Sequence, residues 1–427
     1  MTSTTGVDLN RAYQRTLRRQ GLLPRWLLRA DKARRWGKLV RGMARRGVRL
    51  RSVDEAGLFH RQLPTTAQTA PNTGETLHPW GDPFTEQGEN IGEVFSISDA
   101  ADRHFLQEYQ ATLGQGITWR PGFLELENVY LHGDWCQPIA LDTQTGYFGS
   151  AIGWRHRTVL KFLPESWDGP VLDALLKGQT PHQPVETLES GILIQCPGMN
   201  VYGHWLLDFL PKIRMALDAP DWRQMPLLFR TLPPWGLRLL QDLGLADRLR
   251  LLNPKTPYRL NRVVIPTTPK LDKVYCQRDM RATFSLIAER AQAALTPEEK
   301  AALPRFEKIF LPRPQPKRKA RNHADIAKYC AENGFHALAP EQYSLFEQAV
   351  IFSRARHVVG EDGSALHNAG FCAPGARLGL YSRGQRQNII HLSLASAFGL
   401  HLTVVPTVTA RDDSYHLPPQ FFAKLLS

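Results

Sequence analysis

Two ionisable side chains four residues apart offer the first chemistry in this sequence. His204 and Asp208 bound the run His204-Trp205-Leu206-Leu207-Asp208, inside a stretch of helical periodicity from Gly203 to Leu217. Residues at this spacing share one helix face. One of them can deprotonate a hydroxyl group while the other orients it. The alternative is a histidine that only caps the helix or is satisfied within the core. Pro211 lies in the same pattern and is expected to kink or shorten the helix.

A second candidate site is the turn Gly360-Glu361-Asp362-Gly363-Ser364, which follows an apolar run and opens a helix. Glycine permits a tight turn, and free N–H groups at a helix N-terminus attract phosphate. We therefore predict that backbone N–H groups and Ser364 contact phosphate. Glu361 and Asp362 would repel a bare phosphate and suit hydroxyl groups of a sugar or ribose. The alternative for Asp362 is a plain helix N-cap.

Basic residues gather after a third apolar run, Lys308–Leu311. Arg313 ends this predicted strand, and Arg318 and Arg321 follow with two lysines in a loop that Pro314 and Pro316 keep extended. Ligands of open parallel sheets bind at the carboxyl ends of the strands. The arginines are placed to hold a diphosphate there. A solvated basic loop is the alternative.

The net charge of +13 is a local feature of the N-terminus. Residues 1–51 carry fifteen of the 53 Lys and Arg residues but two of the 40 acids, so the rest of the chain is balanced. Trp and Leu among arginines in residues 20–50 favour basic helices. We predict that residues 11–51 bind an anionic membrane surface. A solvated extension and nucleic-acid binding remain alternatives.

Cysteine usage and apolar runs bear on the compartment. The five cysteines are far apart and show no CxxC spacing, which fits a reducing compartment. Arginines interrupt the short apolar runs at the N-terminus, and no stretch reaches the roughly 18 apolar residues of a membrane span. We expect a cytoplasmic protein, peripheral at the inner face of the cell membrane.

Strand-like and helix-like segments alternate from Gly191 onward, which predicts parallel sheets covered by helices. Short strands around Leu124–Leu131 and Ile139–Leu141, joined to a run that ends at Ile152, predict hairpins. The expected organisation is a basic helical extension at residues 1–60, a linker or irregular region at 61–122, an α/β domain at 123–298 and a Rossmann-like domain at 299–427.

In their order and spacing, these motifs resemble glycosyltransferase family 61. The resemblance extends over roughly residues 125–405. It rests on His204–Pro211, Leu311–Arg313 with Arg318–Asn322, Gly334-Phe335 with Pro340–Gln348, and Gly360–Asn368 with Phe371–Gly375. Asp362 stands where many members have histidine, so a role of that histidine is not carried over.

The resemblance implies an α/β, GT-B-like fold of two facing Rossmann-like doubly wound domains. It also implies inverting transfer of a sugar from a nucleotide-sugar to a glycan or lipid-linked acceptor, in surface or capsular polysaccharide synthesis. The resemblance places the acceptor side in residues 123–298 and the nucleotide-sugar site in residues 299–427. It implies no metal bound by an Asp-x-Asp motif, and the sequence contains no such motif. No cofactor is expected, because the nucleotide-sugar is a substrate. The catalytic candidates are His204 and Asp208. The donor-binding candidates are Arg313, Arg318, Arg321, Glu361, Asp362, Gly363, Ser364 and Asn368.

Two other classes of function stay open. A nucleic-acid-binding protein would use the basic N-terminus, although the balanced remainder and the lack of a known motif disfavour it. The second alternative is a metal-dependent hydrolase, although the sequence lacks histidine pairs at zincin spacing. Its ligands would be His132, Asp134, His204, Asp208, Asp362 and His367.

The oligomeric state of the protein also stays open.

Overall fold

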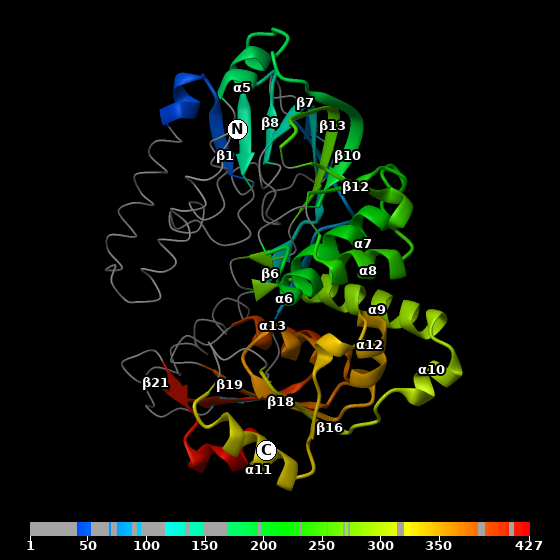
Figure 1. Cartoon of the computed structure of the whole chain (residues 1–427), viewed down its shortest axis with the longest axis vertical. Helices are drawn as coiled ribbons and strands as arrows, with labels where there is room; N and C mark the ends of the chain where they lie inside the picture. The colour runs from blue at the N-terminus through cyan, green and yellow to red at the C-terminus, as the bar shows by residue number, and fades with distance from the viewer. Residues whose placement is uncertain are drawn as a thin grey trace, which may run out of the picture.

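The structure is a computed structural model of a mixed α/β protein. It describes residues 41–52, 68–69, 75–87, 92–94, 116–132, 137–148, 169–194, 198–230, 232–253, 255–267, 270–271, 274–313, 320–382, 389–409 and 414–427. Residues 1–40 are not among the described residues. Most of the segment predicted to bind a membrane, residues 11–51, therefore lies outside the described part of the chain. Figure 1 shows one large sheet at each end of the molecule, with a layer of helices between them.

The first sheet is ten-stranded and mixed. Its parallel part is formed by β13 (Tyr258–Pro266), β10 (Glu186–Leu193), β11 (Leu227–Phe229) and β12 (Leu249–Leu251). The antiparallel β7 (Gly122–His132) lies on the other side of β13, and β8 (Gln137–Ala140) and β9 (Thr145–Phe148) continue from it. The predicted hairpins are thereby confirmed.

The second sheet is six-stranded and parallel. The strand order is β17 (His336–Ala337), β16 (Lys308–Leu311), β18 (His357–Glu361), β19 (Arg377–Ser382), β20 (His401–Pro406) and β5 (Gly92–Val94). Among the strands after residue 300, the first and third lie side by side and the second lies outside the first. This is a doubly wound order, whose direction reverses between β16 and β18.

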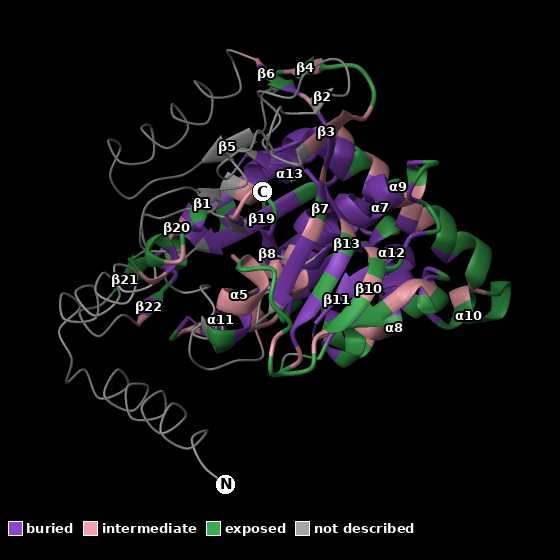
Figure 2. Ribbon diagram, turned by 90° about the horizontal axis from the view of Figure 1, so that it is seen from above, coloured by how far each residue is buried: buried purple, intermediate pink, exposed green. Residues whose placement is uncertain are grey.

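Two predicted regions differ from the structure. Residues 61–122 are not simply a linker, because β3 (Glu75–Pro79) pairs with β7 and β5 pairs with β20. The extension predicted for residues 1–60 includes β1 (Arg49–Ser52), a strand that pairs with β9. The Pro, Thr and Asn residues within residues 61–122 favour a loop, but backbone pairing with strands distant in the sequence outweighs the weak local preference of these residues. The predicted boundary at residues 298–299 falls inside α10 (Pro297–Ala302), which is exposed along its length (Figure 2).

Helix α9 (Gln277–Ala294) lies between the two sheets in Figure 1 and joins their cores. Its Phe284 packs against Phe371 and Phe398 of the second sheet's helices, with ring centroids 4.6 Å and 4.9 Å apart. On the other side, Arg214 of α7 (Leu210–Asp218) donates to the buried Asp279 of α9 at 2.8 Å. Buried side chains from both sheets therefore form one contiguous hydrophobic cluster.

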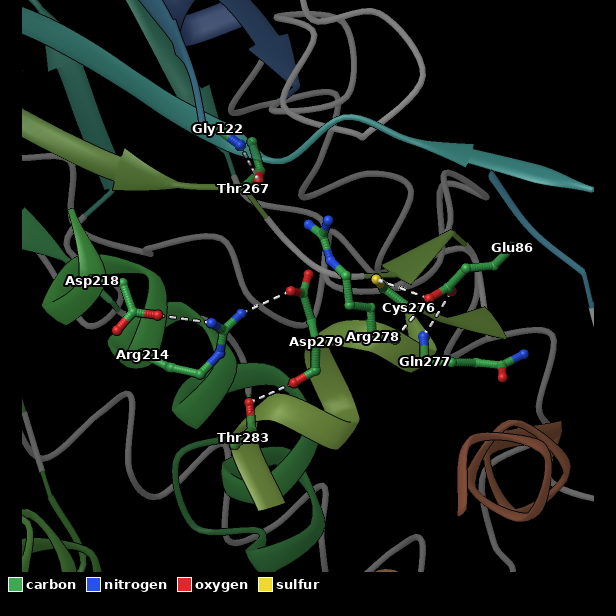
Figure 3. A network of polar contacts seen from close by, with 10 residues as sticks. All are labelled: Glu86, Gly122, Arg214, Asp218, Thr267, Cys276, Gln277, Arg278, Asp279 and Thr283. Atoms are coloured by element: carbon green, nitrogen blue, oxygen red, sulfur yellow. Dashed lines mark hydrogen bonds and ion pairs between the residues drawn. The ribbon is translucent and has the colours of Figure 1, made fainter. Parts of the chain in front are cut away.

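The N-terminus of α9 is capped by a side chain from far away in the sequence (Figure 3). The Glu86 carboxylate accepts hydrogen bonds from the backbone N–H groups of Gln277 and Arg278, at 2.8 Å and 2.7 Å. The Arg278 guanidinium lies 3.4 Å from the centroid of the Phe84 ring. A carboxylate at this end also complements the helix dipole. The antiparallel pair of β4 (Phe84–Glu86) and β6 (Ile117–Trp119) is thus fixed to α9.

Candidate functional site

The segment that carries His204 and Asp208 is helical, as predicted, but changes its winding. Tyr202–His204 form α6, Trp205–Phe209 form a π-helical turn, and α7 begins at Leu210. Pro211 has no N–H to donate, and its ring would clash with the carbonyl four residues earlier in a regular α-helix. A π-turn widens the helix there and lets it continue. Pro211 thus neither ends nor shortens the helix.

His204 and Asp208 form a hydrogen-bonded pair, with His204 Nδ1 2.5 Å from Asp208 Oδ2. The other carboxylate oxygen of Asp208 accepts a hydrogen bond from Lys270 Nζ at 2.9 Å. The Asp208 side chain is 0% exposed, whereas that of His204 is 27% exposed. If Nδ1 of His204 donates to Asp208, Nε2 is left as the ring nitrogen that can take a proton. The pair can therefore act as an oriented base, with His204 as the group that an incoming molecule reaches.

The topology of the first sheet explains why Lys270 meets Asp208. Strands β10 and β13 are parallel neighbours, so their carboxyl ends lie at the same edge of the sheet. The chain after β10 leads into α6, and the chain after β13 leads into the hairpin of β14 (Lys270–Leu271) and β15 (Val274–Tyr275). Lys270 and Tyr275 face each other in this hairpin, with Nζ 3.4 Å from the hydroxyl group.

The charge of Asp208 is set by its two partners. Burial alone would raise the pKa of this carboxyl, but the Lys270 ammonium and the His204 ring outweigh it and hold the pKa well below its usual range. Burial raises the pKa of Tyr275, and the Asp208 carboxylate adds to this effect. Asp208 is therefore an anion that faces both the His204 ring and the Lys270 ammonium.

Two glycines allow other groups to approach this helix closely. Gly198 has a φ of +104°, and a Cβ added there would lie 2.5 Å from Cδ2 of His204. A Cβ on Gly203 would lie 2.5 Å from Cε1 of His367 and 2.9 Å from Oγ of Ser364. His367 and Ser364 belong to η5 (Ser364–Phe371), the 3-10 helix that follows β18 of the second sheet. The two sheets thus bring His204 and the Gly360–Ser364 turn together.

The turn after β18 lies at the point where the second sheet reverses its strand order. Arg313, just beyond β16, reaches across to it: Nε lies 3.2 Å from Oε1 of Glu361, and Nη2 donates to the carbonyl of Asp362 at 2.8 Å. A Cβ on Gly363 would lie 2.8 Å from Nη2, so a larger residue there would displace the end of the Arg313 side chain. Arg313 therefore holds the turn in place, and Glu361 balances its charge.

The acidic side chains of the turn have different surroundings. Glu361 is buried, and burial raises its pKa against the opposing effects of Tyr415 and Arg313. Burial would also raise the pKa of Asp362, but the neighbouring His391 ring and the Arg313 guanidinium lower it. Asp362 does not act through a side-chain cap of η5, whose first turn has no side-chain cap hydrogen bond. It is a partly exposed carboxylate beside a buried imidazole.

The remaining predicted donor-binding residues are spread more widely. Arg318 lies outside the described residues, and Arg321 is exposed next to α11 (His323–Glu332). Asn368 is fully buried: its Oδ1 accepts from the Tyr202 hydroxyl at 2.7 Å, and its Nδ2 donates to Oε1 of Gln348 at 2.8 Å. This amide connects α6 to η5 and α12 (Leu345–Ser353) and sets the distance between the two sheets' loops.

Sequence reasoning missed Lys270, Tyr202, Gln348 and His391. Lys270 is 62 residues from Asp208, and His391 is 29 residues from Asp362, so no local spacing reveals either pair. Gln348 stands in the segment Pro340–Gln348 that carried the resemblance, and its role follows only from the contact with Asn368. The sequence signal that could have identified them is a polar side chain within an apolar segment, since such a side chain is expected to be buried.

Two searches of the described residues returned nothing. No group of three or more His, Cys, Asp and Glu side chains in this part of the chain is arranged to hold a metal ion. Within the same residues, no helix has the length and apolar character that crossing a membrane requires.

Residues 202–379 match the family model described as glycosyltransferase 61. The matched segment begins at Tyr202, includes the His204–Asp208 pair, Lys270, Arg313 and the Gly360–Ser364 turn, and ends within β19. It is shorter than the range over which the motifs show the resemblance, and it excludes His391. No curated protein matches the chain.

Proposed function

We propose that this glycosyltransferase moves a sugar from a nucleotide-sugar donor to an acceptor hydroxyl with inversion at the anomeric carbon. The premise is the glycosyltransferase 61 domain, which supports an enzyme of this class. The observation that supports the proposal is the close approach of His367 and Ser364 to Gly203, which puts the turn proposed to bind phosphate beside the His204–Asp208 pair.

The acceptor side is assigned to His204. Its Nε2 would take the proton of the acceptor hydroxyl as the oxygen attacks the anomeric carbon and the bond to the diphosphate breaks. Asp208 is enclosed by His204 and Lys270 and has no exposed surface, so it is poorly placed to attack the sugar itself. Because Asp208 is not exposed, we propose that His204 acts as the base of a direct displacement by the acceptor oxygen, which inverts the configuration.

The donor side is assigned to the turn after β18. Gly363, Ser364 and the backbone N–H groups at the start of η5 would contact the diphosphate. Arg313 would add positive charge from a position fixed by Glu361 and the Asp362 carbonyl. Arg318 and Arg321 are proposed to extend this basic surface. No bound cofactor is proposed, because the nucleotide-sugar is consumed as a substrate.

Arg313→Ala is expected to raise the Kd for nucleoside diphosphates at least about tenfold, because a charge-assisted contact and the anchor of the turn are both lost. A thermal-shift screen of nucleoside diphosphates and nucleotide-sugars identifies the donor, since a ligand of the folded state raises its stability. Calorimetry then measures the Kd of both proteins. Arg356→Ala is the control, because Arg356 is exposed just before the amino end of β18, at the opposite edge of the sheet. Equal affinities of wild type and Arg313→Ala would contradict the diphosphate role.

We also propose that the acceptor is a glycan or lipid-linked glycan of surface or capsular polysaccharide, used at the inner face of the cell membrane. The support is the basic N-terminal segment, each of whose Lys and Arg residues adds about 1 kcal/mol of attraction near an anionic surface.

Removal of residues 1–40 is expected to abolish binding to anionic liposomes in a sedimentation assay, while transfer to a soluble acceptor is retained. The cut precedes β1, so the first sheet keeps its edge strand. Neutral phosphatidylcholine liposomes are the control surface. Undiminished sedimentation of the shortened protein with anionic liposomes would refute the membrane role, and preferential, salt-dependent binding of the intact protein to DNA or RNA would favour the nucleic-acid alternative.

A further inference from the structure

The side chain of Asp362 is supported from behind by a histidine that no motif revealed. Oδ1 of Asp362 lies 3.2 Å from Nδ1 of His391, which belongs to α13 (Ile389–Phe398). The Asp362 side chain is 21% exposed, whereas that of His391 is 1% exposed. The carboxylate therefore has one side against a buried imidazole and another that an incoming molecule can reach.

Hydrogen bonding around this pair is incomplete. Oδ1 of Asp362 and both ring nitrogens of His391 are buried without a hydrogen-bond partner among the described residues, because the 3.2 Å contact lacks hydrogen-bond geometry. Buried polar groups are nearly always satisfied, and an exception calls for an explanation such as a bound water, ion or ligand. Three incompletely satisfied atoms at one point thus indicate a place prepared for a polar ligand.

The Asp362–His391 pair is connected to His204 through His367. The ring of His367 stands 5.1 Å from that of His391, centroid to centroid, and its Nδ1 also lacks a partner among the described residues. His367 in turn lies against Gly203, next to His204. Burial lowers the pKa of His367 to about 3, so its ring is neutral at physiological pH. The His367 ring, which lies between Asp362 and His204, is therefore polar but uncharged. This part of the site suits hydroxyl groups.

The charges of the turn select what Asp362 can bind. The Arg313 guanidinium is paired with Glu361 and donates to the main-chain carbonyl of Asp362, and its charge contributes to the lowered pKa of the Asp362 carboxyl. A carboxylate at this position would repel a phosphate or a sugar acid. It would bind a hydroxyl group by a charge-assisted hydrogen bond.

We propose that Asp362 binds a hydroxyl group of the transferred sugar, and that His391 is the positioning residue that fixes Asp362 for this contact. The donor would then carry a neutral, hydroxyl-bearing sugar in preference to a uronic acid. This inference rests on the proposed function, since it concerns the same donor site.

Calorimetry with matched ligands tests the inference. The ligands are UDP, UDP-glucose and UDP-glucuronate, together with GDP and GDP-mannose, and the proteins are wild type, Asp362→Asn, His391→Leu and His391→Asn. Wild type is expected to bind one neutral nucleotide-sugar more tightly than its diphosphate, and UDP-glucuronate more weakly than UDP-glucose. Asp362→Asn and His391→Leu should lose about tenfold or more of the nucleotide-sugar affinity but less than about twofold of the diphosphate affinity. His391→Asn keeps a donor toward Asp362 and should retain most of the affinity.

Each other result has a distinct meaning. An equal loss of affinity for diphosphate and nucleotide-sugar, with His391→Asn as impaired as His391→Leu, would show a merely structural pair and overturn the inference. Unchanged affinities in all variants, or tighter binding of UDP-glucuronate than of UDP-glucose, would overturn it as well. If wild type binds none of the five ligands, the proposed donor itself is wrong. Thermal unfolding of each variant shows whether it is folded, and His401→Gln, an exposed change in β20, is the matched control.

Discussion

Asp208→Asn is expected to lower the turnover of sugar transfer about 10²–10⁴-fold, the range typical for loss of a positioned acid–base group. The amide cannot stabilise a proton on His204, and its NH₂ group can turn the ring so that Nε2 no longer accepts. Donor binding is proposed for the turn of the other sheet, so the Kd for the nucleoside diphosphate should change less than about twofold. Steady-state kinetics and calorimetry on the same samples separate the two effects.

Variants of the same helix make the Asp208 result specific. Asp218→Asn, at the exposed end of α7, removes a surface carboxylate that pairs with Arg214 and should leave turnover close to that of wild type. His204→Ala should lose turnover as severely as Asp208→Asn, because the two side chains act as one unit. Near-normal turnover in both His204→Ala and Asp208→Asn would remove the base from the proposed mechanism.

Lys270→Met is expected to lower the free energy of unfolding by about 3–5 kcal/mol, the cost of leaving a buried charge without its partner. Methionine matches the length of the lysine side chain, so the cavity term is small. Asp208 would then lack the ammonium 2.9 Å from Oδ1 and keep only His204. Equilibrium denaturation in urea measures the change.

The double variant Asp208→Asn/Lys270→Met separates stability from catalysis. With both charges gone, it should recover much of the stability that Lys270→Met loses, yet remain as inactive as Asp208→Asn. A double-mutant cycle gives the coupling energy directly. Additive losses of stability would show that the two charges do not interact strongly, and recovery of turnover would show that the Asp208 carboxylate is dispensable.

The central strands of the second sheet could be predicted from the sequence because they are buried. Runs such as Ile309–Leu311 and Val358–Val359 are continuous apolar segments, typical of central parallel strands. The helix at Leu345 could also be predicted, since Ser344 and Glu347 form the capping box that their spacing indicates. Strands β3 and β5 could not, because their stability comes from partners distant in the sequence.

The candidate site likewise combines contacts that local sequence spacing indicates with contacts that only the tertiary fold produces. His204 and Asp208 are four residues apart on one helix, so local geometry indicated their contact, and the structure has it at 2.5 Å. Lys270 and His391 reach their acidic partners only through the order of strands and the packing of α13. The roles assigned to the donor-binding residues stay predictions, and Asn368 gains a structural role that its position in a motif did not indicate.

Strand β5 has a consequence for biosynthesis and for fragments of this protein. Gly92 pairs with Leu402, about 300 residues later, so the edge of the second sheet is completed only when nearly the whole chain has been translated. Contacts of such sequence separation slow folding. A fragment that begins at residue 299 would leave the edge of β20 unpaired and prone to associate with other chains. The dependence of folding on chaperones and the yield of soluble protein should therefore be as sensitive to changes in residues 92–94 as to changes in the apolar strands of the same sheet.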